Sequence, residues 1–237
     1  MKVLIIIPAY NEEKNLSQLL DKIKQICPEC NVVVVNDCSK DGTHAVCVNN
    51  SINVINLPVN LGIGGAVQTG YKYAFYNNYD VAVQVDGDGQ HDPQYIKLLV
   101  DELGKGYNMC IGSRFINKEG FQSTLIRRMG IKYFSSLIRI FTGCIVTDPT
   151  SGFRACDRKA IGLFASDYPR DYPEPEAIVN ITRCKLTVSE IPVIMGRREE
   201  GKSSINAVKS IYYIVKVSLA IMIASFYKNK RLEDMDQ

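Results

Sequence analysis

Two aspartates at the end of an apolar stretch are the first candidates for chemistry in this sequence. In VAVQVDGDGQHDP, residues 81–93, Asp86 and Asp88 are one residue apart, with glycines beside them and Gln90 close behind. Carboxylates held this close repel each other, so a bound cation is the usual reason for the arrangement. Carboxylate and amide oxygens suit a hard divalent ion such as Mg²⁺ or Mn²⁺ that keeps open positions for phosphate oxygens. The stretch therefore predicts a metal site that neutralises a diphosphate.

Two other interpretations of this stretch are weaker. A D-x-D-G sequence also begins the calcium loop of an EF-hand, but the twelfth position counted from Asp86 is Lys97, where that loop needs a glutamate. His91 is compatible with an additional ligand, although a histidine beside Asp92 and a proline is more often a turn residue. A divalent ion that binds phosphate remains the better interpretation.

Polar residues also follow the other apolar runs. Asp37 ends VVVVND, residues 32–37, and a carboxylate at this place in a nucleotide-binding α/β fold accepts hydrogen bonds from a ribose or a base. A cap on the following helix is an equally natural role for Asp37, and Glu12 is compatible with a first-turn helix acid. No GxGxxG follows the first strand and no GxxxxGK[ST] occurs, so the dinucleotide-binding and P-loop classes lose their main support.

Strand and helix patterns alternate in the first half of the chain and place these polar residues at strand ends. Segments with apolar residues at helical spacing separate the runs, as with Leu16, Leu19, Leu20, Ile23 and Ile26 in the segment after the first run. We predict a doubly wound, Rossmann-like α/β fold with a mostly parallel sheet and helices on both faces. Ligands of such sheets bind outside the carboxyl ends of the strands. The predicted strands are 3–7, 32–37, 52–57, 80–85 and 109–114.

The second half of the chain has a different character. Residues 121–143 carry apolar residues at helical spacing with basic residues between them, and a final apolar helix is predicted over 207–227. Lys209 and Lys216 lie seven residues apart and therefore share one face of that helix, which favours a helix lying in a membrane interface over a span. An ordinary core-packing helix is the alternative. We expect one domain over residues 1–205 and a C-terminal amphipathic segment over 206–237.

Composition limits the class of protein. A chain of 237 residues suits one α/β domain with a short appendage. The formal net charge of +3, from 28 basic and 25 acidic residues, argues against a general nucleic-acid binder. Eight cysteines without a signal-peptide pattern are best interpreted as reduced cytosolic thiols. The CPEC at 27–30 is compatible with a redox pair or half of a zinc site, but no second CxxC accompanies it.

The ordered motifs of the chain resemble those of the family 2 glycosyltransferases. Within that family they are most similar to the branch of dolichyl-phosphate mannosyltransferase and the bacterial polyprenyl-phosphate glycosyltransferases. The resemblance extends to about residue 205 and implies a GT-A type fold with a nucleotide-sugar site. The motifs are IIIPAYNEEKNL, VVVVNDCSKDGT, NLGIGGAVQTG, VQVDGDGQHDP, IGSRF at 111–115, DPTSGFR at 148–154 and an RxxGxS element at 198–203.

The resemblance also implies a role for each candidate residue. It puts the nucleotide pocket at Pro8, Tyr10 and Glu12, the base at Asp37, the ribose and diphosphate at Asp86, and the metal at Asp88 and Gln90. It assigns the acceptor phosphate to Arg114 and Arg127, and a mobile loop closing on the donor diphosphate to Arg198 and Ser203.

The last of these motifs departs from the mannosyltransferase pattern. That pattern has a lysine after the serine of RxxGxS, whereas this chain has Ser204 there, and Lys202 is a candidate for supplying the missing charge. The SS variant is, by resemblance, more typical of UDP-sugar users, so we expect a UDP-sugar donor rather than GDP-mannose.

The implied reaction is an inverting transfer of a hexose or N-acetylhexosamine to polyprenyl phosphate. Because the acceptor phosphate is already an anion, it needs positioning more than a strong base. We expect Asp88, Arg114 and Arg198 to be catalytic, together with Asp148, which is either structural or the base used with hydroxyl acceptors. Residues 171–176, DYPEPE, are compatible with Glu174 or Glu176 near the sugar, but their two prolines more plainly indicate a rigid loop, so neither glutamate is counted among the expected site residues.

Two alternatives and a location complete the expectations. One alternative is a glycosyltransferase that acts on a saccharide or lipid-linked saccharide hydroxyl in polysaccharide or cell-wall synthesis, and the other is a catalytically silent, membrane-associated binding subunit. The expected location is cytoplasmic, peripheral on the inner face of the cell membrane. The expected partners are the membrane surface and a small membrane-protein partner or a second copy of the chain, but no nucleic acid.

Overall fold

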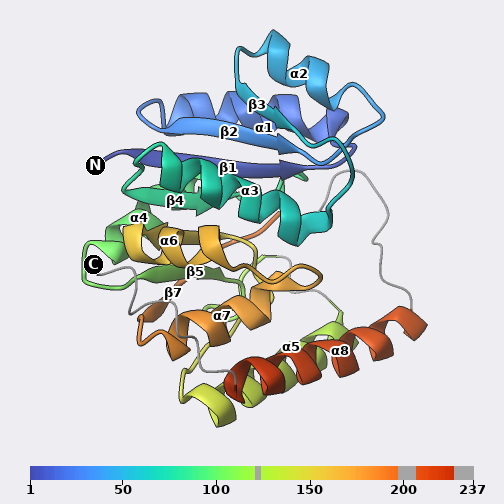
Figure 1. The fold of residues 1–237 in the computed structure, drawn as a ribbon, viewed down its shortest axis with the longest axis vertical. Helices are drawn as coiled ribbons and strands as arrows, with labels where there is room; N and C mark the ends of the chain where they lie inside the picture. The colour runs from blue at the N-terminus through green and yellow to red at the C-terminus, as the bar shows by residue number, and fades with distance from the viewer. Residues whose placement is uncertain (121–123, 197–206, 227–237) are drawn as a thin grey trace.

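The computed structural model describes residues 1–120, 124–196 and 207–226 (Figure 1). Three predicted site residues, Arg198, Lys202 and Ser203, lie outside these ranges. The five predicted strands each correspond to a strand of the fold, with ends that differ by at most two residues, and the helical patterns between them correspond to helices.

The centre of the molecule is one seven-stranded sheet in the order β3-β2-β1-β4-β6-β5-β7. Every neighbouring pair is parallel except those made by β6, which runs antiparallel to both β4 and β5. The prediction of a mostly parallel sheet is confirmed. The strands are β1 (Val3–Ala9), β2 (Asn31–Asn36), β3 (Asn53–Asn56), β4 (Val81–Gln84), β5 (Met109–Ser113), β6 (Arg154–Asp157) and β7 (Val188–Pro192).

Helices cover both faces of the sheet, as predicted. The face with Ile5 and Ile7 of β1 packs against α1 (Glu13–Ile26), α2 (Thr43–Asn49) and α4 (Ile96–Leu103). The face with Leu4 and Ile6 packs against α3 (Gly62–Tyr76), α6 (Arg158–Ser166) and α7 (Pro173–Arg183). All seven residues of β1 are buried, which explains its continuous apolar run. Each fully buried aliphatic side chain contributes about 1.5–3 kcal/mol to folding.

The remaining two helices, α5 (Leu125–Thr142) and α8 (Ala207–Phe226), lie side by side beyond α7 (Figure 1). The hydroxyls of Tyr133 and Ser218 join them at 3.0 Å. Val217 and Ile221 of α8 are buried, so one face of this helix packs as the core-packing alternative predicted. Within the described part of the chain, no helix combines the length and apolarity needed to cross a membrane.

One local prediction was wrong. Residues 171–176 were expected to form a rigid loop, but α7 begins at Pro173. Proline fits the first helical position because its fixed φ suits the helix and the N–H that it lacks has no partner there. Glu174 and Glu176 then lie in the first turn, where the helix dipole favours negative charge.

Candidate active site

The loops that follow β1 and β2 are joined to each other by hydrogen bonds. Asn11 accepts from the backbone N–H of Lys40 at 2.8 Å, and its own N–H donates to the hydroxyl of Ser39 at 3.0 Å. Glu12 N–H donates to Thr43 Oγ1 at 2.9 Å, at the start of α2. These bonds fix the two loops together at the carboxyl end of the sheet, where ligands of α/β folds bind.

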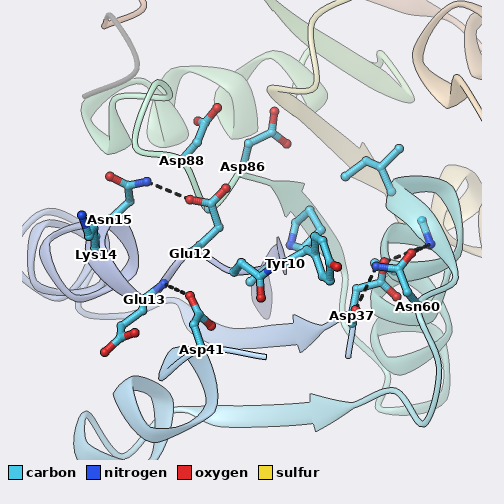
Figure 2. Close-up of a pocket in the computed structure, with 17 residues that line it drawn as sticks. Tyr10, Glu12, Glu13, Lys14, Asn15, Asp37, Asp41, Asn60, Asp86 and Asp88 are labelled. Atoms are coloured by element: carbon cyan, nitrogen blue, oxygen red, sulfur yellow. Dashed lines mark hydrogen bonds between the residues drawn. The ribbon is translucent and has the colours of Figure 1, made fainter. Parts of the chain in front are cut away.

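A cleft of about 790 Å³ opens between these loops and the end of β4 (Figure 2). Its volume lies in the range of small-molecule sites. Half-exposed Tyr10 lies between Asp37 and Asn60 at one end and Glu12, Asp86 and Asp88 at the other. The cleft is lined by six of the residues predicted to bind the nucleotide or the metal: Pro8, Tyr10, Glu12, Asp37, Asp86 and Asp88.

Asp37 is buried and its carboxylate accepts two backbone hydrogen bonds. Leu61 N–H donates to Oδ1 at 2.7 Å and Gly62 N–H donates to Oδ2 at 2.9 Å. Gly62 begins α3, so Asp37 caps α3. The alternative role predicted a cap on the helix that directly follows Asp37 in the chain, which is α2. The capping role and the predicted contact with a base are compatible, because Asp37 also lines the cleft.

The aspartates of the DGDG segment lie at the other end of the cleft. Asp88 Oδ1 accepts from Gln90 N–H at 3.1 Å, which orders the turn after β4. Six carboxylates and one lysine are among the described residues that line the cleft, so a diphosphate would meet net negative charge there. A divalent cation held by one or two carboxylates and by phosphate oxygens would resolve this conflict, and Asp86 and Asp88 fit that donor set.

The protein itself offers few ligands. Among residues 1–120, 124–196 and 207–226, no three histidine, cysteine, aspartate or glutamate side chains gather closely enough to hold an ion. The side chain of Gln90 donates from Nε2 to the carbonyl of Gly196 at 3.2 Å, and Gln90 borders a neighbouring hollow rather than the cleft. The donor set is therefore the one Mg²⁺ or Mn²⁺ uses when phosphate completes the shell.

His91 contributes more to the site than its sequence context suggested. Its side chain is buried, and Nδ1 accepts from the backbone N–H of Asp86 at 3.0 Å. Its ring stacks on Phe153 with 4.8 Å between centroids. The turn-residue interpretation missed this role, because the contact with Phe153 joins segments 62 residues apart.

Arg114 and Asp148 form a bidentate ion pair beside the cleft. Nε donates to Oδ2 at 2.6 Å and Nη2 donates to Oδ1 at 2.8 Å, while the Arg114 backbone N–H also donates to Oδ2. The Asp148 side chain is 0% exposed and that of Arg114 17%. Burial opposes the charge of Arg114, but the hydrogen bonds and the charge of Asp148 outweigh it and raise the pKa of Arg114.

Glu190 of β7 holds the backbone beside this ion pair. Its carboxylate accepts from the N–H groups of Thr147 and Asp148 at 2.7 and 2.9 Å. Burial raises the pKa of Glu190, although these hydrogen bonds act in the opposite direction. Nothing in the sequence near Glu190 signalled this role, because only the pairing of β5 with β7 brings it to the DPTSGFR segment.

The other predicted site residues lie apart from the cleft. Arg127 is in the first turn of α5 and exposed. The amino-terminal end of α5 is on the same side of the sheet as the carboxyl end of β1 in Figure 1. Glu174 is half-buried at the start of α7, and burial raises its pKa to about 6, opposed by the charge of Arg154.

Comparison with known proteins gives consistent results. The family model described as glycosyl transferase family 2 matches residues 4–163. An undecaprenyl-phosphate mannosyltransferase of Micrococcus luteus is 31% identical over 215 residues, covering 87% of this chain and 88% of the relative. A UDP-N-acetylglucosamine–dolichyl-phosphate N-acetylglucosaminyltransferase of Methanococcus voltae is 30% identical over 212 residues, covering 81% of this chain and 84% of the relative.

A solved structure shares the fold. Glucosyl-3-phosphoglycerate synthase from Mycobacterium tuberculosis, in complex with Mn²⁺, uridine-diphosphate-glucose and phosphoglyceric acid, matches with a TM-score of 0.74 and 16% identity. The match covers 97% of this chain and 81% of that chain, which confirms the GT-A type fold. The family model covers more than half of the chain, and the two relatives extend the similarity beyond it. The chain is therefore a glycosyltransferase and belongs to glycosyl transferase family 2.

Proposed function

We propose that this enzyme transfers a sugar, with inversion, from a nucleotide donor bound with Mg²⁺ or Mn²⁺ to a polyprenyl phosphate. The observation that carries the proposal is the acidic cleft at the carboxyl end of the sheet, which Asp37 from one segment and Asp86 and Asp88 from another both line. The names of both relatives, one an undecaprenyl-phosphate and one a dolichyl-phosphate transferase, support the acceptor.

The donor half of the reaction follows from the residues of the cleft. Tyr10 is exposed enough to stack on a base, and the carboxylate of Asp37 lies at the end of the cleft where it would contact that base. Asp86 faces the ribose, diphosphate and cation, and Asp88 would hold the cation. The Gln90 side chain, which donates to the carbonyl of Gly196 outside the cleft, would join them only after turning. When bound at these residues, a divalent cation would offset the charge of the departing nucleoside diphosphate. Arg198, Lys202 and Ser203, which lie outside the described residues, close on the diphosphate in this proposal.

The acceptor half of the reaction uses Arg114 and Arg127. A phosphate nucleophile is ionised at neutral pH, so these arginines need only orient it and offset its charge. Asp148 then serves to orient Arg114, because its carboxylate accepts Nε, Nη2 and the backbone N–H of that residue as well as the hydroxyl of Thr150. A general base would have to give up this ion pair, which supports a structural role for Asp148.

The exposed side of α5 supports an approach to the membrane from the cytoplasmic face. Leu125, Met129 and Ile140 are exposed there together with basic side chains of the same helix. Apolar and basic groups together favour the surface of an anionic leaflet. In this proposal the C-terminal segment 206–237 adds to that surface or binds a small membrane protein or a second copy.

The test is a panel of UDP- and GDP-sugars with Mn²⁺ and undecaprenyl phosphate, in which the lipid-linked product is measured. We expect product with a UDP-sugar, because Ser204 replaces the lysine of the GDP-mannose pattern. To check metal dependence, a chelator is added: product formation should stop and should return when Mn²⁺ is added back. Product with GDP-mannose alone would contradict the prediction of a UDP-sugar donor. If there is neither product nor binding of Mn²⁺–UDP, the silent binding subunit is favoured.

Asp148→Asn separates the two acceptor classes. If the acceptor is a phosphate, we expect a modest loss of rate, because no proton has to be removed. With a hydroxyl acceptor, loss of the base would lower kcat by about 10²–10⁴-fold. Ser151→Ala, in the same segment but outside the ion pair, is the matched control for disturbance of the loop.

A further inference from the structure

The carboxylate of Asp86 is packed against a glycine from a distant segment. A Cβ added at Gly152 would lie 2.9 Å from Oδ2 and 3.0 Å from Oδ1 of Asp86, and 3.0 Å from Nε2 of Gln84. The backbone of Gly152 does not have the positive φ that favours glycine, so this position excludes a side chain by space and not by conformation. Any larger residue would push the two polar side chains away.

Gln84 forms a hydrogen bond with the same carboxylate. Its side chain is 0% exposed, and Nε2 donates to Asp86 Oδ1 at 3.2 Å. Its Oε1 has no hydrogen-bond partner among the described residues. Burying an amide with an unpaired oxygen costs about 1–3 kcal/mol, so the presence of glutamine at this buried position calls for an explanation.

The backbone of Asp86 is held as well. His91 Nδ1 accepts from its N–H at 3.0 Å, and the His91 ring stacks on Phe153, the neighbour of Gly152. The segment 151–154 is anchored in turn, because Arg154 donates to the carbonyls of Ser151 and Pro149 at 2.7 and 3.0 Å. The position of Asp86 is therefore set by three neighbours outside the cleft: Gln84, Gly152 and the His91–Phe153 stack.

We infer that Gly152 and Gln84 are positioning residues that fix the Asp86 carboxylate in the orientation in which it receives the cation and diphosphate of the donor. This inference rests on the proposed function. Gly152 leaves the space into which Asp86 leans, and the Gln84 amide selects its rotamer. Without them the carboxylate turns away from the cleft while the sheet is unchanged, because only the ends of flexible side chains move.

Gly152→Ala tests the inference in the full-length protein. The readouts are Mn²⁺ binding in the presence of UDP, by electron paramagnetic resonance and calorimetry, and the melting temperature. We expect affinity for Mn²⁺–UDP to fall about 10–100-fold, the usual effect of disturbing the residues behind a metal ligand, with little change in melting temperature. Gly130→Ala is the matched control, since a Cβ there meets nothing within 4 Å and binding should stay at the wild-type value.

Gln84→Met is a second variant that also tests whether the Asp86 carboxylate has to be held in place. Methionine has a similar shape, removes the donor to Asp86 and removes the unpaired Oε1, so the fold should tolerate it. We expect Mn²⁺–UDP affinity to fall about tenfold. If Gly152→Ala does not fold, this variant decides the question alone.

The outcomes separate the two proposals. Weaker Mn²⁺–UDP binding by a folded variant supports the inference. Wild-type affinity in both variants would overturn it and leave the proposed function standing. Failure of the wild-type protein itself to bind Mn²⁺–UDP would overturn the proposed function and the inference together.

Discussion

The proposed donor and acceptor regions of this enzyme are built in different ways. The donor cleft lies between loops that bond to each other directly, as Asn11 does with Ser39 and Lys40. The acceptor region depends on one buried ion pair, Arg114–Asp148, and on α5, which exposes apolar and basic side chains. The donor cleft is acidic, whereas the exposed charges of α5 include Arg127, Lys132 and Arg139.

This difference follows from what each region binds in the proposed reaction. A nucleotide donor is a small, defined molecule that a rigid cleft recognises at low entropic cost. A polyprenyl phosphate lies in a membrane, so its binding surface must remain open to lipid. The comparison predicts that variants in the cleft affect chemistry without affecting the fold, whereas variants in the acceptor region affect stability or membrane binding.

The largest expected effect is in the donor cleft. Asp88→Ala should lower transfer by about 10³-fold or more, because it removes a ligand of the cation that offsets the charge of the leaving diphosphate. Product formation and the melting temperature are measured together. Exposed Asp101 of α4 provides the matched control, Asp101→Ala. Substantial activity of Asp88→Ala would contradict the metal assignment.

Arg114→Ala should destabilise the acceptor region. It leaves the carboxylate of Asp148 buried without its partner, which should lower the free energy of unfolding by about 3 kcal/mol. Urea unfolding measures the effect. The double variant Arg114→Met, Asp148→Leu should recover most of the loss, since it leaves no buried charge. Equal stability of the single and double variants would show that the pair does not act as a unit.

Glu174→Gln should change how stability depends on pH. The pKa of Glu174 is raised from 4.5 to about 6 in the folded protein, so the folded state binds the proton more tightly than the unfolded state does. The free energy of unfolding therefore falls by about 2 kcal/mol as pH rises from about 4.5 through 6. The variant lacks this contribution and should show a flatter profile by urea unfolding. Identical slopes in the two proteins would contradict the prediction.

The smallest expected effect concerns the exposed side of α5. Met129 and Ile140 are 72% and 75% exposed, and replacing both with glutamate should weaken binding to anionic vesicles about tenfold. Binding of Mn²⁺–UDP should not change, because the donor cleft is separate. Tyr76→Glu on α3, where Tyr76 is 77% exposed, is the matched control. A similar loss in the control would point to general charge repulsion instead of a specific surface.

Much of the fold could be predicted because its patterns are local. The buried run 3–7 and the alternation of strands and helices predicted the parallel sheet, and the strand ends predicted the edge at which Asp37, Asp86 and Asp88 meet. The start of α7 was missed because Pro173 was interpreted as a loop signal, although proline is equally suited to a first helical turn. The assigned roles of the site residues remain predictions.

The sequence by itself determined the family, the parallel sheet and the position of the polar residues at strand ends, because motifs and hydrophobic periodicity depend on neighbours along the chain. Tertiary structure decided how Asp86 is held and what Asp148 binds. Gly152 contacts Asp86, and the guanidinium of Arg114 binds Asp148 through two hydrogen bonds, across more than thirty residues in each case. Such contacts depend on strand order and antiparallel β6, which bring distant segments together at distances that no local pattern encodes. The pair of aspartates in DGDG was visible in the sequence, but the groups that orient the first of them were visible only in the fold.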